Sequence, residues 1–156
     1  RRPAALARPG KARMKLSRRG LYALKALLVL AELPAGSVAR IQAIAEKESI
    51  PQKFLESILV TLKNARIVES VRGAMGGYRL KRPAGEIFLG EIVRLMDGPL
   101  APFGDAAELR RLVREDPPHA GLFSVLLDVR DAAAQILDST SLRDVHQRTR
   151  ALARRG

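Results

Sequence analysis

The order of hydrophobic periods along residues 17–82 constrains this chain more than any other feature. Apolar residues first recur at helical spacing in three successive runs, and the spacing then changes to that of short strands. The two strand-like runs, 67–72 and 78–82, are separated by five residues, three of which are glycine. This order predicts a mainly α fold with a small β-hairpin, the layout of a winged helix-turn-helix in which the hairpin is the wing.

Local signals place the helices within this order. Ser17 predicts the N-cap of a first helix that reaches Leu33, where a proline and a glycine end it. Apolar residues on nearly every face of this helix predict packing on several sides. Ser37 predicts the start of a short second helix, and Pro51 suits the first turn of a third. A fourth helix is predicted over 89–97, where apolar residues share one face.

The last third of the chain carries different helical signals. Asp105 begins a D-x-x-E start signal for a small helix, and a longer helix is predicted over 122–137. Apolar residues recur along the longer helix at helical spacing, while Asp128, Arg130 and Asp131 are predicted to face outward. This helix is long enough to pair with a copy of itself.

These signals divide the chain into successive parts. Ser141 and Asp144 form a capping signal for a last short helix, which precedes a basic segment. The predicted parts are a disordered basic leader, a winged helix-turn-helix domain, a loop with a short helix, a C-terminal dimerisation helix with a terminal helix, and a basic tail, over residues 1–13, 14–98, 99–121, 122–147 and 148–156.

Positive charge is distributed unevenly along the chain. The formal net charge of +12 divides into +5 for residues 1–13, +6 for 14–103 and +1 for 104–156. The leader lacks hydrophobic periodicity and the features of a secretory or mitochondrial targeting segment. The excess in the next part indicates that it binds a polyanion; charge that serves solubility alone is the alternative.

The absence of cysteine excludes several kinds of site. The sequence offers no disulfide framework, thiolate metal site, cysteine-ligated iron–sulfur cluster or cysteine nucleophile, and this composition fits a cytoplasmic protein. The most apolar run, 21–33, is too short and too charged to cross a bilayer. The glycine-rich loop lacks the G-K-[ST] ending of a nucleotide site, and no catalytic triad or carboxylate pair stands out. We therefore predict a protein that is not an enzyme and has no cofactor.

The polar surface of the predicted winged helix suits double-stranded DNA. A short turn between the second and third helices lets the third helix project its polar face into a major groove. The hairpin places four cations around a flexible glycine loop, from which they can reach phosphates or a narrow minor groove. These cations are Arg72, Arg79, Lys81 and Arg82.

Five segments resemble a known family. They are M-K-L-S-R-R-G-L-Y-A-L-K-A-L at 14–27, I-P-Q-K-F-L-E-S-I-L at 50–59, V-R-G-A-M-G-G-Y-R-L-K-R-P at 71–83, E-I-F-L-G-E-I-V-R-L-M-D-G-P at 86–99 and L-D-S-T-S-L-R-D-V at 137–145. In this order they resemble the Rrf2 (Rrf-two) family of bacterial winged-helix transcription regulators. The resemblance implies a homodimeric repressor in which the long helices of two subunits pack together and present two winged helices to a palindromic operator.

The resemblance also implies a set of DNA contacts. The start of the third helix reads the major groove, where Gln52 suits an adenine edge and Lys53 suits guanine or a phosphate. Arg72, before the first loop glycine, corresponds to a minor-groove reader, and the start of the first helix approaches the backbone. Arg79 and Lys81 are weaker candidates, because hairpin positions alternate faces. The full set is Ser17, Arg18, Arg19, Tyr22, Pro51, Gln52, Lys53, Ser57, Arg72, Gly73, Arg79 and Lys81.

One departure from the family pattern concerns the sensor. Cluster-binding members carry three cysteines between the fourth helix and the long helix, whereas residues 98–121 here contain none. The sequence therefore resembles a clusterless member. A metal site that joins His119 to a neighbour such as Asp116 stays open, although a lone histidine in such a loop is more often simply exposed; the only other histidine is His146.

Two alternative functions are left open by the sequence. The first is a regulator controlled chiefly by a protein partner or small ligand that docks on residues 98–121. The second is a relic enzyme or an RNA-binding module.

Overall fold

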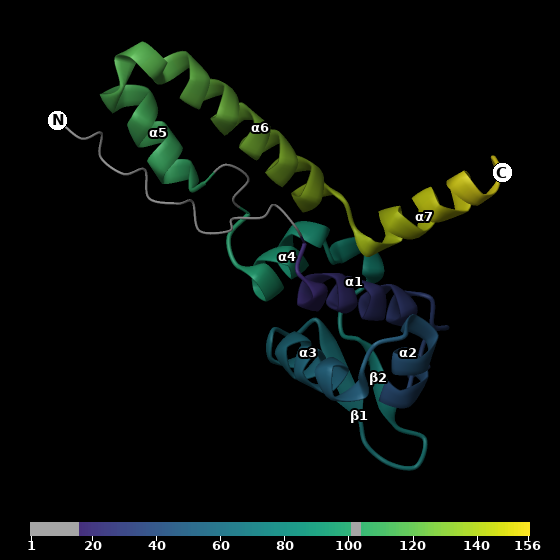
Figure 1. Ribbon diagram of the computed structural model, residues 1–156. Helices are drawn as coiled ribbons and strands as arrows, with labels where there is room; N and C mark the ends of the chain where they lie inside the picture. Colours follow the sequence, from purple (N-terminus) through teal and green to yellow (C-terminus); the bar gives the residue numbers. More distant parts are fainter. Residues whose placement is uncertain (1–15, 101–103) are drawn as a thin grey trace.

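The computed structural model describes residues 16–100 and 104–156 (Figure 1), so the predicted leader at 1–13 lies outside the described residues. Within them the chain is mainly helical, with one two-stranded antiparallel sheet. The elements in chain order are α1 (Arg18–Ala31), α2 (Ile41–Glu48), α3 (Gln52–Asn64), β1 (Val68–Val71), β2 (Gly77–Leu80), the 3-10 helix η1 (Ala84–Glu86), α4 (Leu89–Asp97), α5 (Ala106–Glu115), the 3-10 helix η2 (Pro117–His119), α6 (Ala120–Ser139) and α7 (Leu142–Ala153).

Helix α1 lies at the centre of the body of the molecule. It packs against α2, α3, α4, α7 and β2, which confirms the expectation of contacts on several sides (Figure 1). Ser17 is its N-cap, as predicted. Leu27 of α1 and Leu55 and Ile58 of α3 are fully buried in the shared core, where each apolar side chain contributes about 1.5–3 kcal/mol to stability.

The wing is a hairpin extended by a third short segment. Strands β1 and β2 pair from Val68 opposite Leu80 to Val71 opposite Gly77. Ala39 adds an antiparallel bridge to Tyr78, since each of these two residues accepts a main-chain hydrogen bond from the other, at 2.8 and 2.9 Å. The sheet edge is therefore joined to the connection between α1 and α2.

This bridge corrects one prediction. Ser37 does not start the second helix: α2 begins at Ile41 with Arg40 as its N-cap. The residues before Arg40 include the extended segment that pairs with the wing, so they are not available for a helical turn. The fourth helix, in contrast, spans the predicted 89–97.

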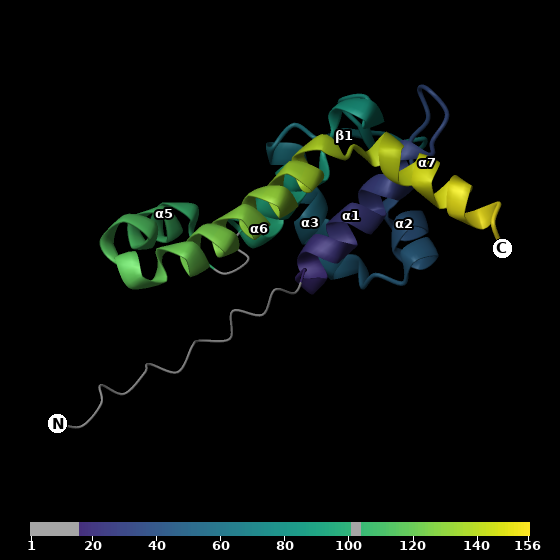
Figure 2. The ribbon, with the colours of Figure 1, turned by 90° about the horizontal axis from the view of Figure 1, so that it is seen from above.

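Helices α5 and α6 form an antiparallel pair that extends away from the body, while α7 extends in the opposite direction (Figure 2). Asp105 caps α5, as its signal predicts. None of the twenty residues of α6, all of which are described, is fully buried in the single chain. Among the described residues no helix has the length and apolarity needed to span a bilayer.

The chain returns to the body at the start of α7. Leu142 is fully buried in the main core, and Ser141 and Asp144 form the predicted capping box. The helix then continues to Ala153, so Arg148 and Arg150, which were expected in a basic tail, lie on α7. Arginine, leucine and alanine favour helix and carry it through this segment.

A second correction concerns α6. Asp128 and Asp131 are exposed as predicted, but the side chain of Arg130 is only 18% exposed. Arg130 lies on the side of α6 toward which half-buried residues such as Phe123 and Leu127 also turn. Because α5 packs along α6, that side is covered, and the expectation of an outward arginine was wrong.

Candidate nucleic-acid interface

The turn between α2 and α3 orients the third helix. Ser49 ends α2 in the left-handed conformation, with φ of 53°, and the chain reverses there. Ile50 then inserts into the core with 4% of its surface exposed, and Pro51 is the N-cap of α3. The turn therefore fixes the start of α3 on the body while its outer face stays open.

The outer face of α3 is polar at its N-terminal end. Pro51, Gln52, Lys53 and Ser57 are all exposed, and the opposite face is buried. In the part of the chain that the structure describes, neither Gln52 nor Lys53 makes a side-chain hydrogen bond or ion pair. Their amide and ammonium groups are therefore available to base edges or phosphates. Glu56 is the single acidic side chain on this face.

Arg19 connects α1 to the same face of α3. Its guanidinium donates to the Ser57 hydroxyl at 3.0 Å and to the Thr61 hydroxyl at 2.7 Å. Tyr22, one turn farther along α1, packs edge-on against Phe54 with ring centroids 5.5 Å apart. Two residues predicted near the DNA backbone thus hold α3 in place, and Arg19 also adds positive charge beside it.

Ser17 and Arg18 differ in their surroundings. The Ser17 hydroxyl accepts from the Gly20 N–H at 2.9 Å and also hydrogen-bonds to the Asp97 carboxylate, and the Ser17 N–H donates to the same carboxylate at 3.0 Å. The hydroxyl is therefore occupied by contacts within the protein. Arg18, next to it, is exposed.

In the wing, four predicted cations divide into two groups. Arg79 pairs with Glu69 directly across the hairpin at 2.6 Å, and Arg82 pairs with Glu91 of α4, also at 2.6 Å. Arg72 and Lys81 are exposed, and neither forms an ion pair within the described ranges. Opposite charges at this distance cancel each other in the field that a phosphate senses. The structure thus separates two neutralised cations from two that are open to a ligand.

Arg72 stands at the entrance to the wing loop. It follows β1, and Gly73 after it has φ of +113°, a backbone conformation that a residue with a side chain rarely adopts. The turn at Gly73 therefore lets the loop leave the strand directly after Arg72.

Sequence reasoning missed Arg40 in this region. Arg40 is exposed at the start of α2, and its guanidinium donates to the Ala74 carbonyl in the wing loop. A hollow of about 480 Å³ lies between the start of α2 and the wing and is lined by Arg40, Gln42 and Arg72 among others. The available signal was a lone arginine directly before the second helix.

Several basic groups of this region lie on one side of the body. The outer face of α3, the start of α2 and the wing lie at the end of the molecule opposite α5 and α6 (Figure 1). Arg40 and Arg72 line the same hollow, and Arg19 contacts the face that carries Lys53. We call this the basic face: Arg19, Arg40, Lys53 and Arg72. A surface of this charge attracts a polyanion through phosphate neutralisation and counterion release.

Comparison with known proteins places this geometry among transcription regulators. The sequence profile named Rrf2, described as an iron-dependent transcriptional regulator, matches residues 16–148. A putative HTH-type transcriptional regulator of Mycobacterium tuberculosis is 36% identical over 136 residues, with 85% of this chain and 81% of that protein covered. The HTH-type transcriptional regulator CymR of Bacillus subtilis is 33% identical over 132 residues, with 85% and 89% covered.

Solved structures agree with the sequence matches. The structure of CymR, described as the global cysteine regulator of B. subtilis, is similar with a TM-score of 0.71 and 32% identity, covering 85% of this chain and 95% of that one. The structure of T. potens IscR is similar with a TM-score of 0.67 and 28% identity, covering 90% and 91%.

The side chains present do not fit an iron site of the kind the profile description implies. The chain contains no cysteine. His119 is hydrogen-bonded through Nδ1 to the Asp116 carboxylate at 2.9 Å, and His146 is bonded through Nε2 to the Leu28 carbonyl at 3.0 Å. Over 16–100 and 104–156, no three His, Cys, Asp or Glu residues gather as a metal would require.

Proposed function

Because this chain belongs to the Rrf2 family of transcriptional regulators, we propose that it is a dimeric, sequence-specific repressor that binds a palindromic operator without an iron–sulfur cluster. The basic face is the observation that carries the proposal. Lys53 at the start of α3 and Arg72 at the wing are exposed and unpaired among the described residues, on two elements that flank one side of the body. A helix in the major groove and a wing beside it would use these two positions together.

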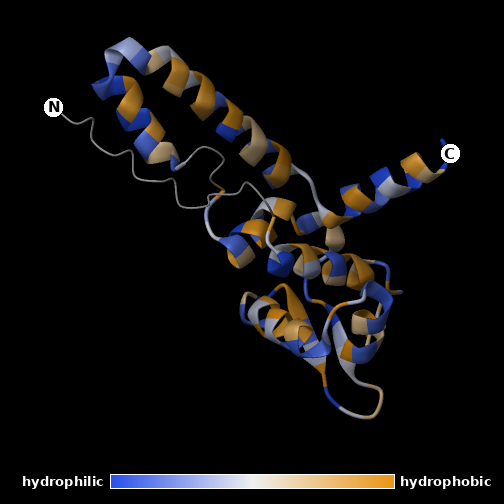
Figure 3. Cartoon of the chain, viewed as in Figure 1, coloured by the Kyte–Doolittle hydropathy of each residue, from blue (hydrophilic) through white to orange (hydrophobic). Residues whose placement is uncertain are grey.

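Dimer formation is supported by an apolar stripe on α6, which consists of Leu122, Val125, Val129, Ala132 and Ile136. These residues are exposed and repeat at alternating intervals of three and four, the spacing of a coiled-coil seam. Apolar segments recur along α6 in Figure 3. Pairing of two such stripes would remove them from water and place two winged helices on one DNA duplex.

A mode of action without a cluster is supported by the donor set. Iron–sulfur clusters in proteins are held mainly by cysteine thiolates, and histidine replaces them only in part. The chain has no cysteine, and the residues that the structure describes offer no set of neighbouring substitutes. We propose that its affinity for DNA is the same in aerobically and anaerobically purified protein.

The proposal is tested by selection of bound sequences from random double-stranded DNA, followed by titration at several salt concentrations. We expect an inverted repeat to be enriched and the affinity to fall steeply with salt. Arg72→Ala and Lys53→Ala should each cost about 1–3 kcal/mol of binding free energy if the side chain reads a base. Lys63→Ala, which removes an exposed lysine from the other end of α3, is the matched control.

Two results would contradict this function. The first is an enriched pool without a common sequence, which would remove the claim of specificity. The second is an equal effect of Lys53→Ala and Lys63→Ala, which would mean that only net charge matters.

A further inference from the structure

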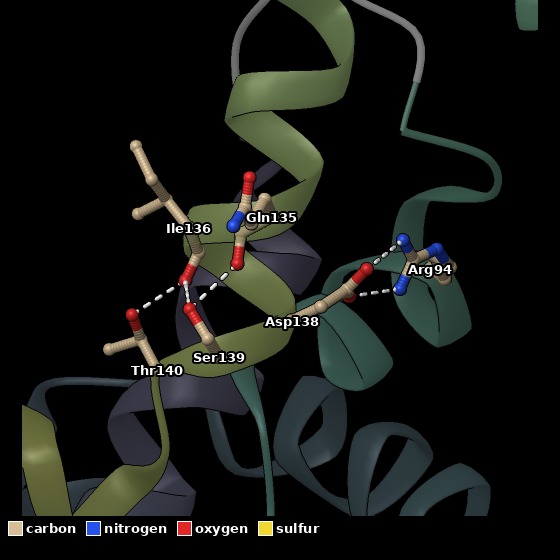
Figure 4. Close-up of polar contacts among 6 residues, drawn as sticks. All are labelled: Arg94, Gln135, Ile136, Asp138, Ser139 and Thr140. Carbon is tan, nitrogen blue, oxygen red and sulfur yellow. Dashed lines mark hydrogen bonds and ion pairs between the residues drawn. The ribbon is translucent and has the colours of Figure 1, made fainter.

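The C-terminal end of α6 is attached to α4 by a paired guanidinium and carboxylate. Arg94 Nη1 donates to Asp138 Oδ1 at 2.5 Å and Nη2 donates to Oδ2 at 2.8 Å, so that the two planar groups face each other (Figure 4). Two parallel hydrogen bonds fix the relative orientation of the groups as well as their distance. Asp138 accordingly has a pKa below its usual range because of its hydrogen bonds to Arg94.

Gly90 provides the space for this pair. A Cβ atom added at Gly90 would lie 1.9 Å from Asp138 Oδ1 and 2.9 Å from Arg94 Nη1. A Cβ atom at this position would displace the Asp138 carboxylate from its place beside Arg94. The sequence of α4 thus contains both the arginine that binds the end of α6 and, one turn earlier, the residue that lets the carboxylate approach.

Main-chain contacts attach the segment that follows α6. The Leu89 N–H donates to the Thr140 carbonyl at 2.9 Å, and the Leu142 N–H donates to the Ile87 carbonyl at 3.0 Å. Phe88 and Ser141 lie between them and form an antiparallel bridge. This short pairing fixes where the chain meets α4. Because the chain changes direction at Thr140, between α6 and this pairing, the tilt of α6 depends on other contacts.

The tilt of α6 has large consequences at its far end. Twenty residues of α helix span about 30 Å, so a tilt of about 7° moves the distal end by roughly 3.5 Å. That displacement equals the rise of about one base pair. A contact that fixes this angle within a few degrees therefore fixes the separation of two DNA-binding units to about one base pair.

We propose that Arg94, Asp138 and Gly90 form a joint that selects the spacing between the two half-sites of the operator. The inference rests on the proposed dimer, in which α6 of each subunit connects the winged helix to its partner. The three residues do not lie on the basic face. They act by setting the direction in which each winged helix is presented.

The test uses DNA duplexes in which two copies of the selected half-site are separated by spacers that differ by one base pair. The full-length wild type and the variants Arg94→Ala, Asp138→Ala and Gly90→Ala are titrated against this series and against a single half-site. Gly90→Ala is informative because it displaces the carboxylate without changing the net charge. Arg111→Ala is the matched control, since it removes an arginine that pairs with Glu108 and Glu115 within α5.

We expect the wild type to prefer one spacing and the three joint variants to lose about two- to five-fold of that preference, the range expected for one exposed ion pair. Affinity for the single half-site should stay unchanged in all of them. The double charge reversal of Arg94→Asp with Asp138→Arg should restore the preference, which a general loss of stability would not allow.

Two outcomes overturn the inference and are distinguishable. If the wild type prefers one spacing and the joint variants retain that preference in full, the joint is refuted and the proposed function stands. If the wild type binds all spacings and the single half-site equally, the proposal that a dimer binds a palindromic operator is refuted, and the proposed joint is refuted with it. Thermal unfolding of each variant identifies any that are not folded. If a single variant is unfolded, the spacing preference of the charge-reversed double variant decides whether the joint is retained or refuted.

Discussion

Replacing Val129 with glutamate should separate the two proposed subunits. Val129 lies in the middle of the apolar stripe on α6, and 44% of its surface is exposed in the single chain. The other large members of the stripe, Leu122, Val125 and Ile136, are 57%, 58% and 62% exposed. Half of a valine or leucine side chain removed from water contributes roughly 1 kcal/mol. Two copies of the stripe therefore provide about 8 kcal/mol before the cost of association.

The substitution acts on this free energy in two ways. It removes the apolar contact of Val129 from both subunits, and it places two carboxylates in a seam from which water is excluded. Desolvation of a charge costs several kcal/mol per ion when no partner is present. A total loss of at least about 4 kcal/mol is expected, which raises the dissociation constant of the dimer by about 1,000-fold.

Sedimentation velocity over a range of protein concentrations measures this effect directly. Ser124→Glu is the matched control, because it adds the same charge at an exposed position of α6 outside the stripe. We expect the control to sediment as the wild type does and Val129→Glu to sediment as a monomer with unchanged helix content. A Val129→Glu protein that remained dimeric with the wild-type dissociation constant would show that the stripe is not the seam.

Three further predictions concern stability. Gly77→Ala should lower the free energy of unfolding by about 1–3 kcal/mol, because the new Cβ would lie 2.5 Å from the main-chain oxygen of Ala39. Gly121→Ala is the control: it has open space around it and should leave the free energy of unfolding unchanged or raise it in chemical denaturation. Leu142→Ala empties a fully buried site and should cost about 2–5 kcal/mol, seen as a lower denaturation midpoint. Hydrogen bonds hold the pKa of Asp138 and of Asp144 below the usual value. Their stabilisation is therefore present above about pH 4 and is lost as the pH falls through the lowered pKa. The free energy of unfolding of the Asp138→Asn, Asp144→Asn double variant should accordingly fall less between neutral and acidic pH than that of the wild type.

The helices of the body could be predicted because their signals are local. Ser17 caps α1, Gly98 follows the end of α4, and the buried stripe of α3 repeats at helical spacing, so each element is specified by neighbours in the sequence. The start of α2 could not be predicted in this way. Ala39 is extended because it pairs with Tyr78, 39 positions later, and no local pattern reports such a contact.

The candidate site shows the same division. The sequence identifies which residues are basic, and the hairpin register brings Glu69 opposite Arg79. The pairing of Arg82 with Glu91 and the contact from Arg40 to the wing loop depend on tertiary packing, so they appear only in the structure. The roles of Lys53 and Arg72 as base readers remain predictions that the binding experiments address.

The attachment of the wing has a consequence for how such a regulator can change over evolutionary time. The hairpin is held close to its loop by hydrogen bonds between main-chain groups of Ala39 and Tyr78, and Gly77, the residue of β2 nearest the loop, packs against the backbone of the same segment. Apart from the requirement for glycine, these contacts use no particular side chain. Substitutions in the exposed loop, including at Met75, can therefore accumulate without detaching the hairpin. In the proposed complex with DNA, new operator preferences can then arise at the tip of the wing while this attachment is inherited unchanged.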